Sequence, residues 1–447
     1  MKGKNVREVA LETLLAIEKN QAYSNLLLNK MIEKHQLSSK DVGLLTEIVY
    51  GTIQRRDTLD YFLRPFLKKP SKLEVWVKVL LRLSLYQMLY LDRVPDRAAI
   101  YEAVEIAKKR GHKGIASMVN GVLRAIQREG VPSLEQIADP VERLAVETSH
   151  PLWLVKRWVK QFGMDEARKM CETNLLPPEQ TARVNITRAT IDETIERLRQ
   201  EGVEVAGGDV APEAIKAEKG NLAHTLAYKE GYLTIQDESS MLVAKALGVK
   251  ENERVLDSCA APGGKSTHIA ELMHNTGQVV SLDIHDHKVK LIQEQAERLH
   301  LTNIQTKVLD SRKVNEYFEK ETFDKILVDA PCTGFGVLRR KPDIKYVKTE
   351  NDIRQLAKIQ REILDAVAPL LKKGGILVYS TCTVDQEENS DVVKDFLEHH
   401  PEFVMDETMK ERLPKKVQPY VKNGQLQILP HYFGSDGFFI ATLRKKV

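Results

Sequence analysis

Short apolar segments alternate with longer segments of helical periodicity over residues 236–447, and this pattern limits the possible folds more than any other feature. The apolar segments predict strands, which cover 254–257, 279–283, 304–308, 324–329 and 376–380. Between them, helical periodicity covers 288–299 and 353–371. This alternation is typical of an α/β, doubly wound, Rossmann-like domain with a largely parallel sheet. Ligands of such domains bind beyond the carboxyl ends of the strands.

The preceding residues show two other patterns. Over residues 1–140, apolar side chains recur at helical spacing without strand-like alternation, which predicts an all-α domain. Residues 141–235 combine helical patterns with short alternating segments, which predicts a small α+β module that binds RNA or links the other two domains. A chain of 447 residues is long enough for about two to four domains, so we expect a multidomain protein with these parts.

Positive charge is concentrated in the predicted all-α domain. The chain carries 67 Lys and Arg against 63 Asp and Glu, a net charge of +4. Residues 1–140 hold 23 of the basic and 16 of the acidic residues, a net charge of +7, and the remainder has a net charge of −3. A basic helical domain favours contact with nucleic acid, and a solvated surface is the equally weighted alternative.

The cysteines and the distribution of apolar residues indicate a cytoplasmic protein. Cys171, Cys259, Cys332 and Cys382 form no CxxC pair, so we expect reduced thiols and no cysteine-based zinc site. No run of about 18 uncharged apolar residues is present, and charged residues interrupt the amino-terminal segment. We therefore expect neither a membrane-spanning segment nor a signal peptide.

A turn of small residues follows the first predicted strand and opens a helix. It reads Cys-Ala-Ala-Pro-Gly-Gly-Lys from Cys259 to Lys265. Glycines let the backbone approach a ligand closely, and the free N–H groups at a helix start bind polar groups. Gly264-Lys265-Ser266 also resembles the end of a phosphate-binding loop, but that pattern requires glycine at the position of Cys259.

Acidic residues at the following strand ends favour a nucleoside cofactor. Asp283 ends the second predicted strand, where a carboxylate accepts hydrogen bonds from ribose hydroxyls. Asp310 follows the third strand and is placed to bind an adenine amino group. Successive carboxylates repel a triphosphate, so S-adenosylmethionine is favoured over a nucleoside triphosphate. His285 and His287 stand next to Asp283, but short-range histidine pairs are usually surface residues, and we predict no metal site.

Two cysteines lie at neighbouring strand ends. The fourth predicted strand ends Asp329-Ala-Pro-Cys332, and the fifth ends Ser-Thr-Cys382. A single cysteine is usually a small buried apolar residue, but the position of both at the ligand edge favours catalysis. Carbon 5 of cytosine is a poor nucleophile, and addition of a thiolate to carbon 6 makes it enamine-like and reactive. Asp329 can bind the cytosine amino group, and Lys265 can donate to the ring edge.

In order and spacing, these motifs resemble the RNA cytosine-5 methyltransferases of the Nol/Nop/Sun family. The matching segments are 259–265, 329–332, 336–345 and 380–382, with Lys341 in place of a histidine in the family pattern. The basic helical domain is similar to the antitermination factor NusB. The resemblance extends over essentially the whole chain and is weakest in the middle module.

This resemblance implies a reaction and a set of site residues. It implies that Cys382 attacks carbon 6, that Cys332 assists product release, and that Asp329 and Lys265 hold the base. It implies binding of S-adenosylmethionine by Cys259, Ala260, Ala261, Pro262, Gly263, Gly264, Lys265, Asp283, Asp310 and Asp329. The implied substrate is one cytosine of 16S ribosomal RNA, in free RNA or in an early small-subunit particle, and we expect a monomer. The alternatives are a target in transfer RNA or 23S ribosomal RNA, and a non-catalytic RNA-binding assembly factor.

A cluster of cations follows the Pro-Cys motif. We predict that its members contact the RNA backbone, although a charge run is more often a solvated face, and they are Arg339, Arg340, Lys341 and Lys345. Phe335 and Tyr346 flank the cluster. Either aromatic residue is suited to stack on a base, and either is equally suited to a protein core.

Overall fold

The computed structural model describes residues 5–20 and 24–447, which divide into two compact units. Residues 1–4 and 21–23 of the predicted all-α domain lie outside the described residues. The helical unit comprises the described residues of 1–176 together with 338–347, and the sheet unit comprises 177–337 and 348–447. The chain therefore passes between the units after Leu176, after Val337 and after Val347.

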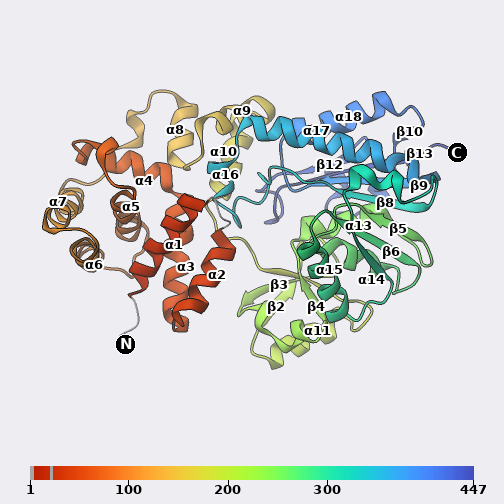
Figure 1. Cartoon of the computed structure of the whole chain (residues 1–447), viewed down its shortest axis with the longest axis horizontal. Coiled ribbons are helices and arrows are strands. Elements are labelled where there is room, and N and C mark those ends of the chain that lie inside the picture. The colour runs from red at the N-terminus through yellow and green to blue at the C-terminus, as the bar shows by residue number, and fades with distance from the viewer. Residues whose placement is uncertain (1–4, 21–23) are drawn as a thin grey trace. The chain divides into compact units, whose positions relative to one another are not determined.

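Helices form the whole regular structure of the described helical unit (Figure 1), as the periodicity predicts. Their apolar faces form one core; in α7, for example, Ala116, Val119, Leu123 and Ile126 are all buried. The helices are α1 (Val6–Asn20), α2 (Ser24–His35), α3 (Ser39–Gln54), α4 (Arg56–Leu63), α5 (Val75–Tyr90), α6 (Asp96–Arg110), α7 (Lys113–Glu129), α8 (Pro140–Glu147), α9 (Leu152–Phe162), α10 (Met164–Thr173) and α16 (Ile344–Val347).

The predicted boundary at residue 140 falls inside the helical unit. Helix α8 begins at Pro140 and packs against α4 and α9. The Thr58 hydroxyl donates to the carbonyl of Val146 at 2.6 Å, and the Asp57 N–H donates to the Ser149 hydroxyl at 2.8 Å. These long-range bonds join the residues after 140 to the helices before it, which no local pattern could indicate.

The first part of the sheet unit is the small α+β module. Its antiparallel sheet has the order β2-β3-β1-β4, formed by β1 (Thr181–Val184), β2 (Glu204–Gly207), β3 (Ala214–Lys219) and β4 (Leu233–Ile235). Helices α11 (Ile191–Gln200) and α12 (Leu226–Lys229) accompany the sheet. Thr190 and Glu193 form a reciprocal capping box that fixes the start of α11.

The larger sheet has the order β11-β12-β13-β9-β8-β5-β6-β7, and β10 pairs with β13. The strands from β5 to β9 run parallel, whereas β13 is antiparallel to β9. The strands are β5 (Arg254–Asp257), β6 (Gln278–Asp283), β7 (Ile304–Val308), β8 (Phe323–Asp329), β9 (Leu371–Thr381), β10 (Phe403–Met405), β11 (Val421–Lys422), β12 (Gln425–Ile428) and β13 (Phe438–Lys445). The doubly wound fold class is thus confirmed, with an antiparallel addition at one edge.

Alternate residues of each central strand enter two different cores. Leu256, Ile326 and Val328 pack under α17 and α18, whereas Val255 and Leu327 pack under α13 and α14 on the opposite face (Figure 1). The helices of this region are α13 (Glu238–Leu247), α14 (Gly264–Leu272), α15 (Asp286–Arg298), α17 (Glu350–Val367), α18 (Ser390–His399) and α19 (Met409–Arg412). The helix predicted over 353–371 ends earlier, since Pro369 interrupts it and Leu371 already belongs to β9.

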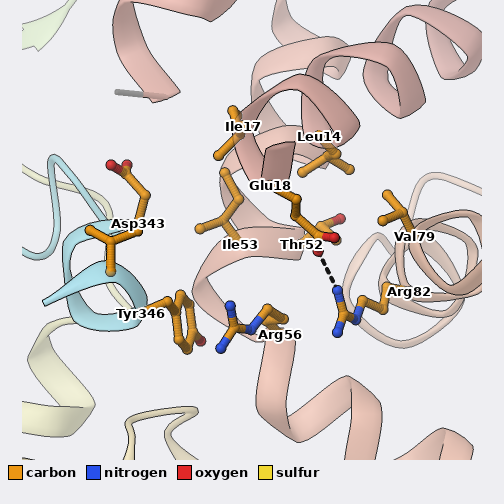
Figure 2. Close-up of a pocket in the computed structure, with 11 residues that line it drawn as sticks. Leu14, Ile17, Glu18, Thr52, Ile53, Arg56, Val79, Arg82, Asp343 and Tyr346 are labelled. Atoms are coloured by element: carbon orange, nitrogen blue, oxygen red, sulfur yellow. Dashed lines mark hydrogen bonds and ion pairs between the residues drawn. The ribbon is translucent and has the colours of Figure 1, made fainter. Parts of the chain in front are cut away.

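Residues 338–347, from the segment predicted to contact RNA, are instead packed into the helical unit. The Ser24 hydroxyl donates to Asp343 at 2.5 Å, and Lys345 Nζ donates to the carbonyl of Gln54 at 2.9 Å. Figure 2 shows the ring of Tyr346 facing the guanidinium group of Arg56, which lies 3.5 Å from the ring centroid. These residues border a cavity of about 310 Å³ that is also lined by α1, α3 and α5.

This packing corrects part of the predicted RNA surface. Lys345 is 2 % exposed and Arg339 is 5 % exposed, so neither side chain can reach a phosphate in this conformation. Arg340 and Lys341 are partly buried. Phe335 is fully buried, and the Tyr346 hydroxyl donates to the carbonyl of Ser149 at 2.9 Å, so both aromatic residues belong to cores.

No helix in residues 5–20 or 24–447 is long and apolar enough to cross a membrane.

Replacing the buried lysine, Lys345→Met, is expected to remove a pH-dependent contribution to stability. Burial lowers the pKa of Lys345 from its ordinary 10.5 to about 7. Between these values the unfolded chain binds more protons, so the wild-type helical unit gains up to about 1.4 kcal/mol per pH unit as pH rises. Thermal melts at pH 7, 8 and 9 should show a Tm difference between wild type and variant that changes with pH. Exposed Lys113→Met is the control, and a pH-independent difference for Lys345→Met would contradict the assignment.

Candidate functional site

A pocket of about 430 Å³ lies at the carboxyl ends of β5, β6, β8 and β9. The sequence predicted that ligands bind at this edge, and several predicted residues line the pocket: Cys259, Ala261, Asp283, Asp310, Asp329, Cys332 and Cys382. Residues not predicted from the sequence also line it, among them Ser258, Ile284, Lys288, Leu309, Ser311 and Arg312. The pocket therefore joins the proposed cofactor turn to both cysteines.

The turn from β5 into α14 approaches its neighbours closely. Gly263 has φ +107°, and a Cβ there would lie 3.2 Å from the Cα of Ile292, so glycine is required. Ala260 is buried and its N–H donates to the carbonyl of Leu282 at 2.7 Å, whereas Pro262 is exposed. Gly264 begins α14 at the other end of the turn.

A buried arginine of the small module supports this turn. Arg183 of β1 is fully buried, and its Nη1 donates to the carbonyl of Gly264 at 2.9 Å. Its Nε and Nη2 donate to the two carboxylate oxygens of Glu271 in α14 at 2.8 and 2.9 Å. The small α+β module thus holds the first turn of α14, which follows the proposed cofactor turn, a role that periodicity could not indicate.

The two acidic residues at the far side of the pocket have local partners. Asp283 accepts a hydrogen bond from the N–H of His285 at 3.0 Å. Asp310 follows β7 and binds Arg312, whose Nη2 lies 2.7 Å from it. The hydrogen bonds and charge of Arg312 lower the pKa of Asp310 despite its partial burial, so the carboxylate is ionised near neutral pH. The described part of the chain contains no group of three or more His, Cys, Asp or Glu side chains suited to a metal ion.

Lys265 and Asp329 form an ion pair beside the cysteines. Lys265 Nζ donates to Oδ2 of Asp329 at 2.7 Å, and the hydroxyl of Ser380 donates to Oδ1 at 2.8 Å. Burial alone would lower the pKa of Lys265, but the charge and hydrogen bond of Asp329 and the charge of Cys382 raise it overall. The site therefore holds a protonated lysine that interacts electrostatically with Cys382.

The two cysteine sulfurs are in contact. Sγ of Cys332 lies 3.3 Å from Sγ of Cys382, and both residues are reduced. The hydrogen bond to Cys382, burial and the charges of Cys382, Glu388 and Asp329 raise the pKa of Cys332 well above its ordinary value. Cys332 is therefore a thiol when Cys382 is a thiolate. Cys259 is also a thiol, because burial raises its pKa, and Cys171 lies buried in the helical unit.

The chain is similar to known proteins over its whole length and theirs. A protein of Bacillus subtilis (strain 168) named probable ribosomal RNA small subunit methyltransferase B is 60% identical over 446 residues, which is 100% of each chain. A model described as 16S rRNA methyltransferase RsmB/F matches residues 244–444. The chain belongs to the RsmB/F family of rRNA methyltransferases.

Further comparisons confirm the predicted resemblance and the three fold types. The NusB family model matches residues 4–128, and a ferredoxin-like domain model of RsmF/B-like methyltransferases matches 150–222. The crystal structure of PH0851 superposes with a TM-score of 0.82 at 27% identity over 99% of both chains. A methyltransferase homologue from Pyrococcus horikoshii gives 0.58 at 28% identity, covering 69% of this chain and 99% of its own. The domain limits at 140 and 235 stay predictions.

Close backbone contact at Gly336 holds the Cys382 loop. The Gly336 N–H donates to the carbonyl of Cys382 at 2.9 Å, and the Gly437 N–H donates to the carbonyl of Gly336 at 2.8 Å. A Cβ on Gly336 would lie 1.9 Å from the carbonyl oxygen of Gly437 and 2.8 Å from that of Cys382. Only glycine fits between the backbone segments at Cys382 and Gly437.

Gly336→Ala is therefore expected to destabilise the sheet unit by about 1–3 kcal/mol, because packed backbone must shift to admit the methyl group. Differential scanning calorimetry would show this as a Tm several degrees lower. Gly207→Ala is the matched control, since a Cβ there meets no atom within 4 Å. An equal, small effect of both substitutions would refute the steric argument.

Proposed function

We propose that this protein transfers a methyl group from S-adenosyl-L-methionine to carbon 5 of a cytosine in 16S ribosomal RNA, through a covalent adduct with Cys382. The observation that carries the proposal is the contact of two thiols, 3.3 Å apart, next to the ion pair of Lys265 and Asp329. A pocket with one thiol would fit many methyl transfers. Two adjoining thiols suit a reaction that both forms and breaks a bond to sulfur.

The pocket residues fit S-adenosylmethionine. Asp283 would accept hydrogen bonds from the ribose hydroxyls, and Asp310 would accept one from the adenine amino group, because a carboxylate has lone pairs beyond those its present partners use. Ile284 and Leu309 supply apolar surface on the same wall for a purine ring. The cofactor supplies a methyl group on a positively charged sulfur.

The base would lie against Lys265 and Asp329. In the free protein these two side chains are hydrogen-bonded to each other. A bound cytosine would donate a hydrogen bond from its amino group to Asp329 and accept one from Lys265. Lys265 also stabilises the thiolate of Cys382, since opposite charges in a buried site favour each other's ionised form. The same ammonium group thus serves both the nucleophile and its target.

The chemistry divides between the two sulfurs. Cys382 Sγ donates an electron pair to carbon 6, the π electrons move to carbon 5, and carbon 5 bonds to the methyl carbon as the sulfonium S–CH₃ bond breaks. The proton on carbon 5 must then leave. Its electron pair re-forms the C5–C6 double bond, and Cys382 departs as a thiolate.

Cys332 is the base we assign to that second half. Its pKa is raised first by its hydrogen bond to Cys382, and the charge of Cys382 adds to this effect. Once Cys382 is bonded to carbon 6 it carries no charge, so these two causes disappear, while burial and the charges of Glu388 and Asp329 still favour the thiol. In our proposal Cys332 then gives its proton to the solvent. The Cys332 thiolate then takes the proton from carbon 5, which restores the starting thiol and thiolate.

The two cysteines should give opposite results in a denaturing gel. Cys332→Ala should still attack and methylate but fail to eliminate, so protein covalently bound to methylated RNA accumulates. Cys382→Ala should form no adduct and no 5-methylcytosine. The assay uses a full-length 16S rRNA transcript, S-adenosylmethionine and each variant.

Retained binding of S-adenosylhomocysteine, measured by calorimetry, shows that each cysteine variant is folded. Adduct from Cys382→Ala and none from Cys332→Ala would reverse the roles, and adduct from neither would remove Cys332 from the reaction.

A basic groove of the helical unit is our proposed contact for the RNA backbone. Lys68, Lys69 and Lys72 are exposed and line a groove of about 490 Å³. None of the three forms an ion pair with any residue in the described ranges 5–20 and 24–447. Lysines without acidic partners attract phosphates, and Leu67, Leu73 and Met118 line the same groove. We infer that the protein acts on RNA in the cytoplasm as a monomer.

Replacing the three groove lysines with alanine should weaken RNA binding and lower its salt dependence. Each lost phosphate contact reduces the slope of log K against log salt by about 0.7–0.9, so a decrease of about 2–3 is expected. Filter binding at several salt concentrations measures this slope. Lys108, Lys109 and Lys113, replaced together, give the same change in net charge outside the groove. The same slope in both triple variants would exclude a specific role for the groove.

A further inference from the structure

Two consecutive residues, Glu388 and Asn389, lie behind the two cysteine loops. Glu388 ends a short 3-10 turn over Gln386–Glu388, and Asn389 precedes α18. Glu388 is fully buried and Asn389 is 1 % exposed. A buried carboxylate is costly unless its hydrogen bonds are satisfied, so the partners of these side chains indicate what they are for.

Glu388 holds the chain on one side of Cys332. Its Oε1 accepts the backbone N–H of Thr333 at 2.8 Å, and its Oε2 lies 2.5 Å from the Thr333 hydroxyl. On the other side, Nε2 of Gln360 donates both to the carbonyl of Pro331 at 2.9 Å and to Glu388 at 3.2 Å. Cys332 is thus bracketed by a connected set of hydrogen bonds.

Asn389 does the same for Cys382. Its Oδ1 accepts from the hydroxyl of Thr381 at 2.6 Å, and its Nδ2 donates to the carbonyl of Thr383 at 3.1 Å. The residues immediately before and after Cys382 are therefore tied to one amide side chain. A second bond from Nδ2 to Gln427, at 3.1 Å, fixes the amide in turn.

One further bond joins the two loops. The hydroxyl of Thr333 lies 2.9 Å from that of Thr383, so the Glu388 set and the Asn389 set form one network. Neither Glu388 nor Asn389 lines the pocket that contains the sulfurs. Asn389 would therefore act on the reaction through its loop, and Glu388 through its loop and through its charge, which adds to the raised pKa of Cys332.

We propose that Glu388 and Asn389 are positioning residues, Glu388 for Cys332 and Asn389 for Cys382, and that this dipeptide sets the separation of the two sulfurs. The inference rests on the proposed function, because the two cysteines act in different halves of that reaction. It assigns a different step to each of two adjoining residues. A purely structural role would affect both steps alike.

Glu388→Ala should reproduce the behaviour of Cys332→Ala. The loop from Pro331 to Thr333 loses its anchor, elimination slows, and adduct with methylated RNA accumulates at least about tenfold above wild type, as a displacement of about 1 Å in a reacting group produces. Glu388→Gln should stay near wild type, since its amide oxygen still accepts the Thr333 N–H.

Asn389→Ala should instead reproduce Cys382→Ala. The Cys382 sulfur is misplaced for attack, so adduct formation should fall by about 10- to 100-fold. RNA containing 5-fluorocytidine isolates this step, because fluorine on carbon 5 blocks the elimination and traps every attack. On that RNA, Glu388→Ala should form adduct at nearly the wild-type rate while Asn389→Ala should not.

Two milder variants and a control substitution at a neighbouring residue complete the experiment. Thr333→Val and Thr381→Val each remove one hydroxyl of the network while keeping the side-chain shape, and they should show weaker forms of the same two behaviours. Gln386→Ala, at an exposed position of the same 3-10 turn, should match wild type. Thermal melts and binding of S-adenosylhomocysteine establish which variants are folded. If an alanine variant is not folded, the corresponding valine variant tests the positioning role instead.

The outcomes separate this inference from the proposed function. If Cys332→Ala accumulates adduct but the Glu388 and Thr333 variants accumulate no more adduct than wild type, the positioning role is refuted and the proposed reaction stands. If the Glu388 and Asn389 variants slow both steps equally, the two residues only support the fold and the inference fails. If no variant and no wild-type protein forms adduct on 5-fluorocytidine RNA, the proposed reaction itself is wrong.

Discussion

Parallel pairing of β8 with both β9 and β5 is the constraint on which the candidate site depends. In the β8–β9 register Asp329 lies opposite Ser380, so the loops that carry Cys332 and Cys382 leave the sheet side by side. On its other side β8 pairs with β5, with Leu327 opposite Asp257. The turn after β5 therefore brings Lys265 to Asp329. A slip of either register by one residue would turn these side chains to the opposite face of the sheet.

Charge balance in the site follows from that geometry. Lys265 is a buried cation, and burial without compensation would favour its neutral form. Asp329 compensates at 2.7 Å, while burial raises the pKa of nearby Asp257 to about 7 and lessens its negative charge. The Lys265 ammonium group thus interacts with both Asp329 and Cys382. The hydrogen bond to Cys382 and its charge in turn raise the pKa of Cys332, which keeps Cys332 a thiol.

The fold types and the strand-end residues could be predicted from the sequence because both depend on local patterns. Strand and helix periods, and the motifs around Cys259, Cys332 and Cys382, are readable without long-range information. The network around Glu388 and Asn389 was missed, although polar residues in a run directly after a cysteine-bearing strand end were the available signal. Arg183 was missed for a different reason: its partner Glu271 is far along the chain, and nothing in either local sequence marks the pair.

Lys345 shows the opposite failure, in which local sequence suggested the wrong environment. A cluster of cations is normally solvated, but Lys345 is buried with its ammonium group on the carbonyl of Gln54. The cause is the excursion of residues 338–347 into the helical unit, where Leu338 and Ile344 are also buried.

Both flanking segments belong to the sheet unit, whereas residues 338–347, just after the Pro-Cys loop, pack among residues of the helical unit. Removal of residues 1–140 would therefore remove the partners of Asp343, Lys345 and Tyr346, in addition to removing basic surface. Loss of activity in such a truncation would not measure RNA binding. For this chain, contributions of the helical unit to RNA recognition are separable from its contributions to the cysteine loops only by substitutions on its surface.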